Sequence, residues 1–362
     1  MKPQSDVTLA PLTTMGVGGP ARWFLDARTE SEICAALGWA QSRGVEVHVL
    51  GGGSNVVIAD AGLDALVLRV GINGVDVVAG DDAMVHSAGA GEEWDAFVAA
   101  TVNGNLAGLE CLSGIPGRIG GTPVQNVGAY GQDVSGTIVR VRAVDRATHR
   151  SEVFSNEECG FAYRASRFKH VDANRFVVSR VDFALRPDAP PTLAYADVVS
   201  YFEARGEATP SLASVRDAIL QIRRRKGMVI EEANPARRSC GSFFVNPVVA
   251  RSHFARVAAA AGETVPHYEV GADQIKIPAA WLIERAGFPK GTSRGVVGIS
   301  PLQPQAIVNH GGAAADDVFE LACDVKQAVW DRFRVAIVPE PVFLGFQLSP
   351  RLSWLLTLSG QS

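Results

Sequence analysis

The segment SCGSFFVNP, residues 239–247, places two weak nucleophiles, Cys240 and Ser242, on either side of a glycine. Either side chain could exchange a proton with a bound ligand, and an extended backbone would put both on the same face. A glycine before a run of Phe and Val also fits a close backbone approach inside an ordinary core. The segment alone leaves its role open, so the rest of the chain has to decide.

Two glycine-rich loops could hold phosphate groups. GGGSN, Gly51–Asn55, follows a β-rich run, and its successive backbone N–H groups can form a concavity for a pyrophosphate, with Ser54 and Asn55 as further donors. A plain turn between strands is the alternative. The second loop, from Ser113 to Tyr130, is long and restrained by two prolines, which is typical of functional loops. Together the loops favour a phosphate-containing ligand.

Other nucleotide-binding signatures are missing from the sequence. GVGG at residues 16–19 neither follows a strand nor opens a helix, as a dinucleotide fingerprint would, and no GxxxxGK[ST] sequence occurs. A Rossmann or P-loop fold is therefore disfavoured. A flavin dinucleotide bound by two α/β subdomains remains open.

The amino-acid composition argues against several classes of function. The 34 basic and 38 acidic residues give a formal charge of −4, which provides no footprint for nucleic acid. The five cysteines and seven histidines are scattered without CxxC or HExxH spacing, so we expect neither disulfides nor a metal site. No signal peptide or membrane-spanning run is seen, and we expect a cytoplasmic protein that binds no membrane.

The elements that must position these residues follow an α/β pattern. Periodicity and turn signals predict helices at residues 30–44, 92–103, 211–226, 250–261 and 279–288, with another that begins at Asp316 and Asp317. They predict strands at 45–50, 63–70, 75–80, 83–90, 137–145, 175–185, 242–249, 305–309 and 334–346. Ser211 is the expected N-cap of the third helix. The tail after residue 346 receives no function.

Seven ordered motifs carry a resemblance to a known family. TTMGVGGPA, VLGGGSNVVIAD, GLECLSGIPGRIGGTPVQNVGAYGQDV, FAYRASRFK, CGSFFVNPVV, IKIPAAWLIERAGF and VPEPVFLG occur in the order seen in the UDP-N-acetylenolpyruvoylglucosamine reductases, also called UDP-N-acetylmuramate dehydrogenases. The likeness runs from about Leu12 to Gly345. TLAYADV further resembles the tyrosine loop of the family's first type.

The resemblance implies an α+β fold with a flavin-binding part of the vanillyl-alcohol-oxidase type. It divides the chain into two flavin-binding subdomains, residues 1–72 and 73–227, a UDP-sugar domain at 228–346 and a tail at 347–362. The implied cofactor is noncovalent FAD, with NADPH as the hydride donor. The matching cofactor-binding residues are Gly51, Gly52, Gly53, Ser54, Asn55, Ser113, Gly114, Ile115, Pro116, Gly117, Gly120, Gly121, Gln125, Asn126, Gly128 and Ala129.

The implied reaction reduces the enolpyruvyl ether of UDP-N-acetylglucosamine enolpyruvate to UDP-N-acetylmuramate for peptidoglycan synthesis. It moves negative charge onto the substrate carboxylate, so it needs a cation there and a proton donor at the adjacent carbon. By the resemblance, Arg164 and Glu340 stabilise the enolate and Ser242 donates the proton. Each residue also has an interpretation without catalysis: Arg164 as a surface arginine, Glu340 as a solvated glutamate in a turn, and Ser242 as a packed serine.

Substrate contacts carry over at Tyr130, Tyr195, Asn246, Lys276 and Gln305, and Arg223 is a plausible further contact. The partners expected are therefore the UDP-sugar and NADPH, with no nucleic acid, and the chain is expected to be a monomer. An oxidase of the same fold that uses molecular oxygen is the first alternative. A noncatalytic flavin or UDP-sugar binding module is the second.

Overall fold

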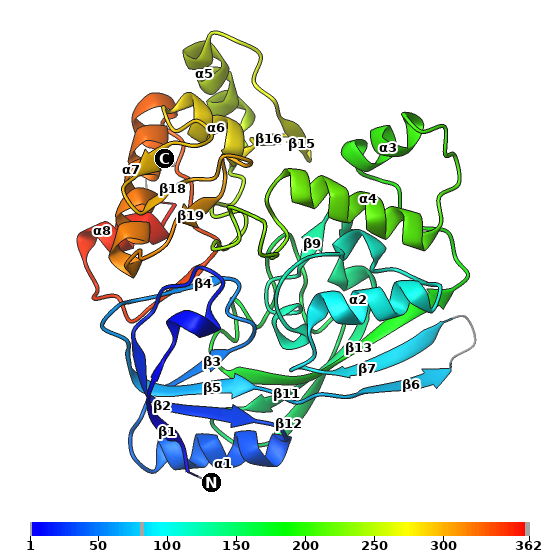
Figure 1. Cartoon of the computed structure of the whole chain (residues 1–362), viewed down its shortest axis with the longest axis vertical. Helices are drawn as coiled ribbons and strands as arrows, with labels where there is room; N and C mark the ends of the chain where they lie inside the picture. Colours follow the sequence, from blue (N-terminus) through cyan, green and yellow to red (C-terminus); the bar gives the residue numbers. More distant parts are fainter. Residues whose placement is uncertain (1, 80–82, 359–362) are drawn as a thin grey trace. The chain divides into compact units, whose positions relative to one another are not determined.

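The computed structural model describes residues 2–79 and 83–358 and divides into two compact units (Figure 1). The first unit contains the N-terminal residues up to Val7, Ala21–Gly52 and Asp64–Arg224. The second contains Thr8–Pro20, Gly53–Leu63 and the chain from Arg225 onward. Each unit is thus assembled from segments far apart in sequence. The four domain ranges expected from the sequence stay a prediction, and residues 359–362 of the expected tail lie outside the described residues.

The first unit contains two main sheets. One has the strand order β1-β2-β5-β3, with β3 and β5 parallel, and the other has the order β12-β11-β13-β7-β6, with β8 also paired to β13. The strands are β1 (Gln4–Thr8), β2 (Pro20–Ala27), β3 (Val47–Leu50), β5 (Leu63–Val70), β6 (Val75–Ala79), β7 (Met84–Gly89), β8 (Leu106–Ala107), β9 (Gly128–Ala129), β10 (Gln132–Asp133), β11 (Ile138–Asp145), β12 (Ser151–Ser155) and β13 (Phe176–Pro187).

Four helices complete this unit: α1 (Glu30–Gln41), α2 (Trp94–Asn103), α3 (Ala196–Glu203) and α4 (Leu212–Arg225, whose last residue the second unit counts). Thr29 caps α1 by accepting the N–H of Glu32, and Ser211 caps α4 by accepting the N–H of Ser214 at 3.0 Å, as expected. The apolar stripes of α1 and α2 are buried in one core with the sheet strands.

The second unit is built from short strands around a long helix. Its strands are β4 (Val56–Ile58), β14 (Val248–Ala250), β15 (Tyr268–Val270), β16 (Gln274–Lys276), β17 (Ser293–Arg294), β18 (Val297–Ile299), β19 (Ile307–Asn309) and β20 (Val342–Leu344). Its helices are α5 (Arg251–Ala261), α6 (Ala279–Arg285), α7 (Ala315–Phe333) and α8 (Pro350–Leu356). The strand orders are β14-β16-β15, β17-β18-β19 and β20-β4, the last pair parallel.

Helix α7 is the centre of the second unit. Its N-terminus is capped from a distance, because both carboxylate oxygens of Asp60 accept the N–H of Ala315, at 2.9 and 2.8 Å. Near its middle, the buried Lys326 donates to the carbonyls of Trp354, Leu355 and Thr357 at the end of α8. Burial lowers the pKa of Lys326 to about 8. This lysine therefore holds the C-terminal helix against α7.

Two strand predictions are wrong. Residues 242–247 of the expected strand at 242–249 form isolated contacts, and the ladder begins only at Val248. Of the expected strand at 334–346, only Val342–Leu344 pairs in a ladder. Prolines at positions 247, 339 and 341 explain both, since each removes a backbone donor from the segment. Within residues 2–79 and 83–358, no helix has the length and apolar character needed to cross a membrane.

Candidate functional site

The two glycine loops meet in the first unit. A Cβ on Gly52 would lie 2.7 Å from the Cα of Gly117, so glycine is required where the loops touch. At Gly51 and Gly121 the opposite holds, because a Cβ there would meet no heavy atom of the described residues within 4 Å. Internal packing therefore does not demand glycine at these two positions. The open space beside them fits a bound group such as the pyrophosphate of a dinucleotide.

The second glycine loop is fixed to the segment before α2 and to α2 itself. Asp95 accepts the N–H of Gly114 at 2.6 Å, and the N–H of Gly120 donates to the carbonyl of Ala90 at 2.9 Å. Asp95 also binds both terminal nitrogens of Arg216 on α4, at 2.6 and 2.9 Å. Burial alone would raise the pKa of Asp95, but the hydrogen bonds from Arg216 and Gly114 lower it. Asp95, which the sequence did not single out, thus anchors the loop as a carboxylate.

Other predicted cofactor-binding residues help to shape this loop. The buried hydroxyl of Ser113 donates to the carbonyl of Glu110 at 2.7 Å, and Asn126 donates to Ala162 at 3.1 Å. The N–H groups of Gly114 and Gly120 are likewise used inside the protein. The other residues predicted on this loop are Ile115, Pro116, Gly117, Gln125, Gly128 and Ala129, while Gly53, Ser54 and Asn55 lie on the first glycine loop.

Arg164 lies against this loop. Its guanidinium donates to the carbonyl of Gly128 at 2.7 Å and, more weakly, to that of Asn126 at 3.4 Å. Its backbone has a φ of 54°, in the left-handed region that disfavours most side chains. Among the nine non-glycine residues of the described chain with positive φ, six are Asn, Asp or His and Arg334 caps α7. The two that remain, Tyr130 and Arg164, are both predicted site residues, and such strain is often kept at functional positions.

Three predicted substrate residues gather in the first unit. The rings of Tyr130 and Tyr195 meet edge to face, with centroids 5.4 Å apart. Arg223 from α4 is buried and hydrogen-bonded to Tyr130, with Asp95 as a nearby negative charge. Burial lowers the pKa of Arg223, and Tyr130 and Asp95 oppose that shift. Two tyrosines with a buried guanidinium have the chemistry to bind a diphosphate.

In the second unit, the segments of Ser242 and Glu340 lie side by side. The N–H of Glu340 donates to the carbonyl of Phe243 at 2.8 Å, and Val245 donates to Val338 at 3.0 Å. Phe243 and Phe244 are fully buried in the core of this unit, with rings 5.3 Å apart. The two predicted catalytic residues are thus brought together by backbone pairing next to rigid aromatic packing.

Asn55 links the first glycine loop to the Glu340 segment. Its side chain donates to the carbonyl of Glu340 at 3.2 Å, and its own carbonyl accepts the N–H of Val342 at 3.1 Å. Cys240 is differently placed: its thiol contacts the carbonyl of Val56 at 3.7 Å, and burial raises its pKa to about 12. A thiol that holds its proton so firmly is a poor nucleophile near neutrality.

The other predicted substrate residues lie further along the second unit. Gln305 donates to the carbonyl of Phe244 and to Asn246 Oδ1, the latter at 3.3 Å, while Asn246 Oδ1 also accepts the N–H of Ala279 at 2.9 Å. The side chains of Asn246 and Gln305 thus help to hold the Ser242 segment. Lys276, on β16, has its ammonium 5.5 Å from the ring centroid of Tyr268.

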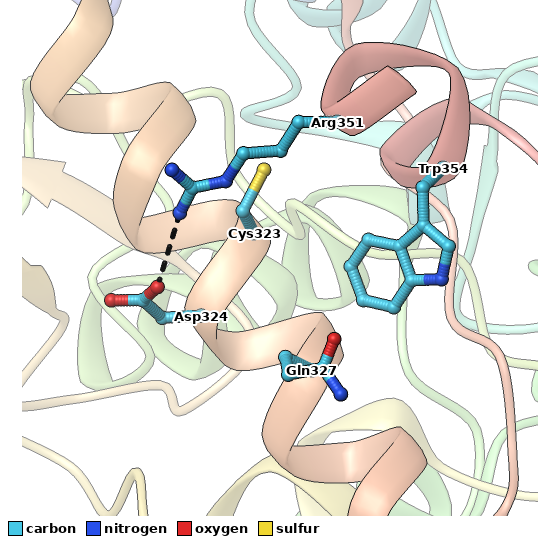
Figure 2. Close-up of a pocket in the computed structure, with 5 residues that line it drawn as sticks. All are labelled: Cys323, Asp324, Gln327, Arg351 and Trp354. Carbon is cyan, nitrogen blue, oxygen red and sulfur yellow. Dashed lines mark hydrogen bonds and ion pairs between the residues drawn. The ribbon is translucent and has the colours of Figure 1, made fainter.

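A separate hollow of about 290 Å³ lies between α7 and α8 in the second unit (Figure 2). Cys323, Asp324 and Gln327 come from α7, and Arg351 and Trp354 come from α8. Arg351 pairs with Asp324 at 3.4 Å, the dashed contact in Figure 2, and with Glu320 at 2.6 Å. The lining includes no predicted site residue, and its charges already stabilise the docking of α8.

Comparison with known proteins assigns the family. Residues 21–149 match the family described as an FAD binding domain, and residues 233–344 match the C-terminal domain of UDP-N-acetylenolpyruvoylglucosamine reductase. A reductase of that name from Thermobifida fusca (strain YX) is 46% identical over 352 residues, which cover 95% of this chain and 98% of the relative. The chain belongs to the UDP-N-acetylenolpyruvoylglucosamine reductase family.

Further comparisons agree with this assignment. A reductase of the same name from Nocardia farcinica (strain IFM 10152) is 45% identical over 94% of this chain and 90% of the relative. The crystal structure of the reductase from Thermus caldophilus shares the fold, with a TM-score of 0.65 and 24% identity over 95% of this chain and 99% of that one. The expected flavin-binding fold with a further C-terminal domain is confirmed, and the chain is an FAD-dependent oxidoreductase.

Proposed function

We propose that this reductase converts UDP-N-acetylglucosamine enolpyruvate to UDP-N-acetylmuramate with NADPH as the source of hydride, a step in peptidoglycan precursor synthesis. The names and extensive similarity of the relatives support the reaction. The observation that carries the assignment of residues is the pairing of the Ser242 and Glu340 segments through the Phe243 carbonyl. The residues of the two glycine loops would hold FAD noncovalently, and the bound flavin would supply the hydride chemistry.

Arg164 binds the substrate carboxylate in this proposal. Its planar guanidinium can make two parallel hydrogen bonds with a carboxylate, which a lysine cannot. The contacts to Gly128 and Asn126 support this role, since they hold the guanidinium beside the loop predicted to bind the cofactor. A fixed cation there stabilises the negative charge that develops on the carboxylate as hydride arrives.

Ser242 donates the proton that completes the reduction. A hydroxyl is a weak acid, but an enolate carbon is basic enough to take its proton when the two are held in contact. Glu340, on the paired segment, stabilises the enolate by donating a hydrogen bond from its carboxyl group, which must be protonated for this role. The position of Ser242 next to the buried Phe243 and Phe244 supports a fixed donor.

Each unit, taken by itself, carries predicted contacts for the UDP-sugar. In the first unit, Tyr130, Tyr195 and Arg223 provide two aromatic hydroxyl groups and a cation for the diphosphate. In the second unit, Lys276, Asn246 and Gln305 provide further polar groups. We propose that the enzyme works in the cytoplasm, where NADPH and the nucleotide sugar are available. We also propose that it is a monomer.

An anaerobic titration tests the proposed reaction. The purified protein, checked for flavin absorbance, is reduced with NADPH and mixed with UDP-N-acetylglucosamine enolpyruvate while the oxidised-flavin band is followed. The proposal expects the band to return at once with formation of UDP-N-acetylmuramate. Return of the band only after air is admitted would instead favour an oxidase, and flavin reduction without any turnover would favour a binding module.

A further inference from the structure

Thr14 connects two functional segments of the second unit. Its hydroxyl lies 2.7 Å from the carbonyl oxygen of Ser239 and 3.4 Å from that of Ser54, and its N–H donates to the carbonyl of Gly53 at 3.0 Å. Because a hydroxyl has a single proton to donate, the shorter contact to Ser239 is the stronger bond. Thr14 therefore joins the GGGSN loop to the segment that precedes Ser242.

The segment that Thr14 holds is a turn. Gly241 has a φ of 68°, and a Cβ at this position would meet no described heavy atom within 4 Å, so its surroundings are open. The N–H of Gly241 contacts the hydroxyl of Ser239 at 3.4 Å, a weak local bond. Apart from this bond and the long contact of the Cys240 thiol with the carbonyl of Val56, at 3.7 Å, the turn between Ser239 and Ser242 depends on its two ends for a fixed shape.

Both ends are held by backbone or side-chain bonds. After the turn, the N–H of Phe243 donates to the carbonyl of Gln305 at 2.7 Å. Before it, the carbonyl of Arg238 accepts the N–H of Asn309 at 3.0 Å, and the next carbonyl, that of Ser239, accepts the Thr14 hydroxyl. Of these bonds, the one from Thr14 is made by a side chain that also contacts the cofactor loop.

We propose that Thr14 is a positioning residue for proton transfer: its hydroxyl fixes the Ser239 carbonyl, and so the place of the Ser242 hydroxyl, relative to the GGGSN loop. This inference rests on the proposed role of Ser242 as proton donor. Holding a weak acid in contact with its acceptor raises the reaction rate far more than it raises the affinity for substrate. A shift of about 1 Å can lower the rate roughly 100-fold. Thr14 itself needs no contact with the substrate.

The test compares Thr14→Val, which keeps the shape of the side chain and removes the hydroxyl, with Thr14→Ser, which keeps the hydroxyl. With FAD bound, Thr14→Val should slow the return of the oxidised-flavin band after substrate addition by roughly 10- to 100-fold, at unchanged substrate affinity. Thr14→Ser should react within a few-fold of the unaltered enzyme. Reduction by NADPH and the dissociation constant of FAD should stay the same in both.

Thr13→Val is a matched control. The hydroxyl of Thr13 is adjacent in sequence and buried, but it contacts the carbonyls of Ala10 and Val17, at 3.1 and 2.9 Å. This variant loses a buried hydroxyl of the same kind without losing the tie to Ser239. It should leave the rate of flavin reoxidation by substrate unchanged, even if the protein unfolds at a lower temperature.

A second readout needs no turnover. Amide hydrogen exchange of the FAD-free protein, followed in peptides that cover residues 239–243, should be faster in Thr14→Val than in Thr14→Ser or Thr13→Val. If Thr14→Val does not fold, Thr14→Ala serves in its place, because it also removes the hydroxyl and adds no bulk.

Unchanged reoxidation and unchanged exchange in Thr14→Val would overturn the inference. A lower affinity for FAD in Thr14→Val, with a normal rate of reoxidation for each bound flavin, would also overturn it, since Thr14 would then contribute only to cofactor binding. Ser242→Ala, measured in parallel, separates the two hypotheses. If Ser242→Ala reacts normally, the proposed proton donor is wrong, whereas a slow Ser242→Ala with a normal Thr14→Val rejects only the positioning role.

Discussion

The N–H of Glu340 donates to the carbonyl of Phe243 at 2.8 Å, so the glutamate is fixed to the residue that follows Ser242. Pro339 and Pro341 flank Glu340 and restrict its backbone, and Asn55 accepts a further hydrogen bond from Val342. The segments that carry the carboxyl group of Glu340 and the hydroxyl of Ser242 are therefore held side by side. This arrangement is well suited to protonating a basic carbon that approaches both groups.

Asp95→Asn should weaken FAD binding by about 10-fold. The change keeps the shape of the side chain and an oxygen that can accept the N–H of Gly114, but it removes the charge that binds Arg216 and strengthens both bonds, so the glycine loop is held more weakly. The dissociation constant of FAD, measured by fluorescence quenching on the FAD-free protein, checks this. Asp217→Asn, one position after Arg216 and exposed on α4, is the control. Equal affinities for the two variants would contradict the prediction.

Asp60→Ala should lower the free energy of unfolding by about 1–2 kcal/mol, the usual value of an N-cap carboxylate. The N–H groups at the start of α7 lose the acceptor that lies 255 residues earlier in the chain. Urea unfolding measures the loss. Asp64→Ala removes an exposed partner of Arg22 and should cost far less, so a similar loss from both substitutions would count against the capping role.

Glu30→Gln should destabilise the protein at neutral pH and not in acid. Burial alone would raise the pKa of Glu30, but bonds from Arg142, Ser179 and Ser151 lower it from 4.5 to about 2. Because the folded pKa is depressed, this stabilisation is complete above about pH 4.5 and is lost as the pH falls toward 2. Thermal unfolding of both proteins between pH 7 and pH 2 checks the prediction. A difference in stability that does not change with pH would contradict it.

Lys326→Met should release the C-terminal helix. The substitution keeps much of the buried volume but removes the ammonium that donates to Trp354, Leu355 and Thr357, at a cost of about 1.5–3 kcal/mol. Limited proteolysis after residue 348 should become faster. Asp331→Asn, further along α7, exposed and outside the lining of the hollow beside α8, is the control and should be cleaved at the rate of the unaltered protein. Equal cleavage of both variants would show that Lys326 does not hold α8.

Sequence patterns predicted α1, α2, α4, α5, α6 and α7, but neither α3 nor α8. The starts of α1, α4 and α7 have capping or acidic residues, and their apolar spacing fits one buried face, so local signals agree with the packing. The segments around Ser242 and Glu340 were misjudged as long strands. Their prolines leave few donors for a ladder, and the contacts that replace it come from distant parts of the chain, such as Gln305.

Residues of the candidate site could be predicted where the local sequence itself is distinctive. The glycine loops and the motifs around Arg164, Ser242 and Glu340 are recognisable as sequence. Thr14 and Asp95 are not, because their partners lie far away: the hydroxyl of Thr14 contacts a carbonyl 225 residues later, and Arg216 follows Asp95 by 121. A single threonine or an aspartate in a helix has no local pattern that reveals such a partner.

The central claim is that Ser242 donates the proton, and stopped-flow absorbance of Ser242→Ala without oxygen tests it most directly. NADPH should reduce the bound flavin at nearly the normal rate, because that step needs no proton from the hydroxyl. Addition of UDP-N-acetylglucosamine enolpyruvate should then reoxidise the flavin more slowly by orders of magnitude. If the two half-reactions slow equally, or if reoxidation stays fast, Ser242 is not the proton donor.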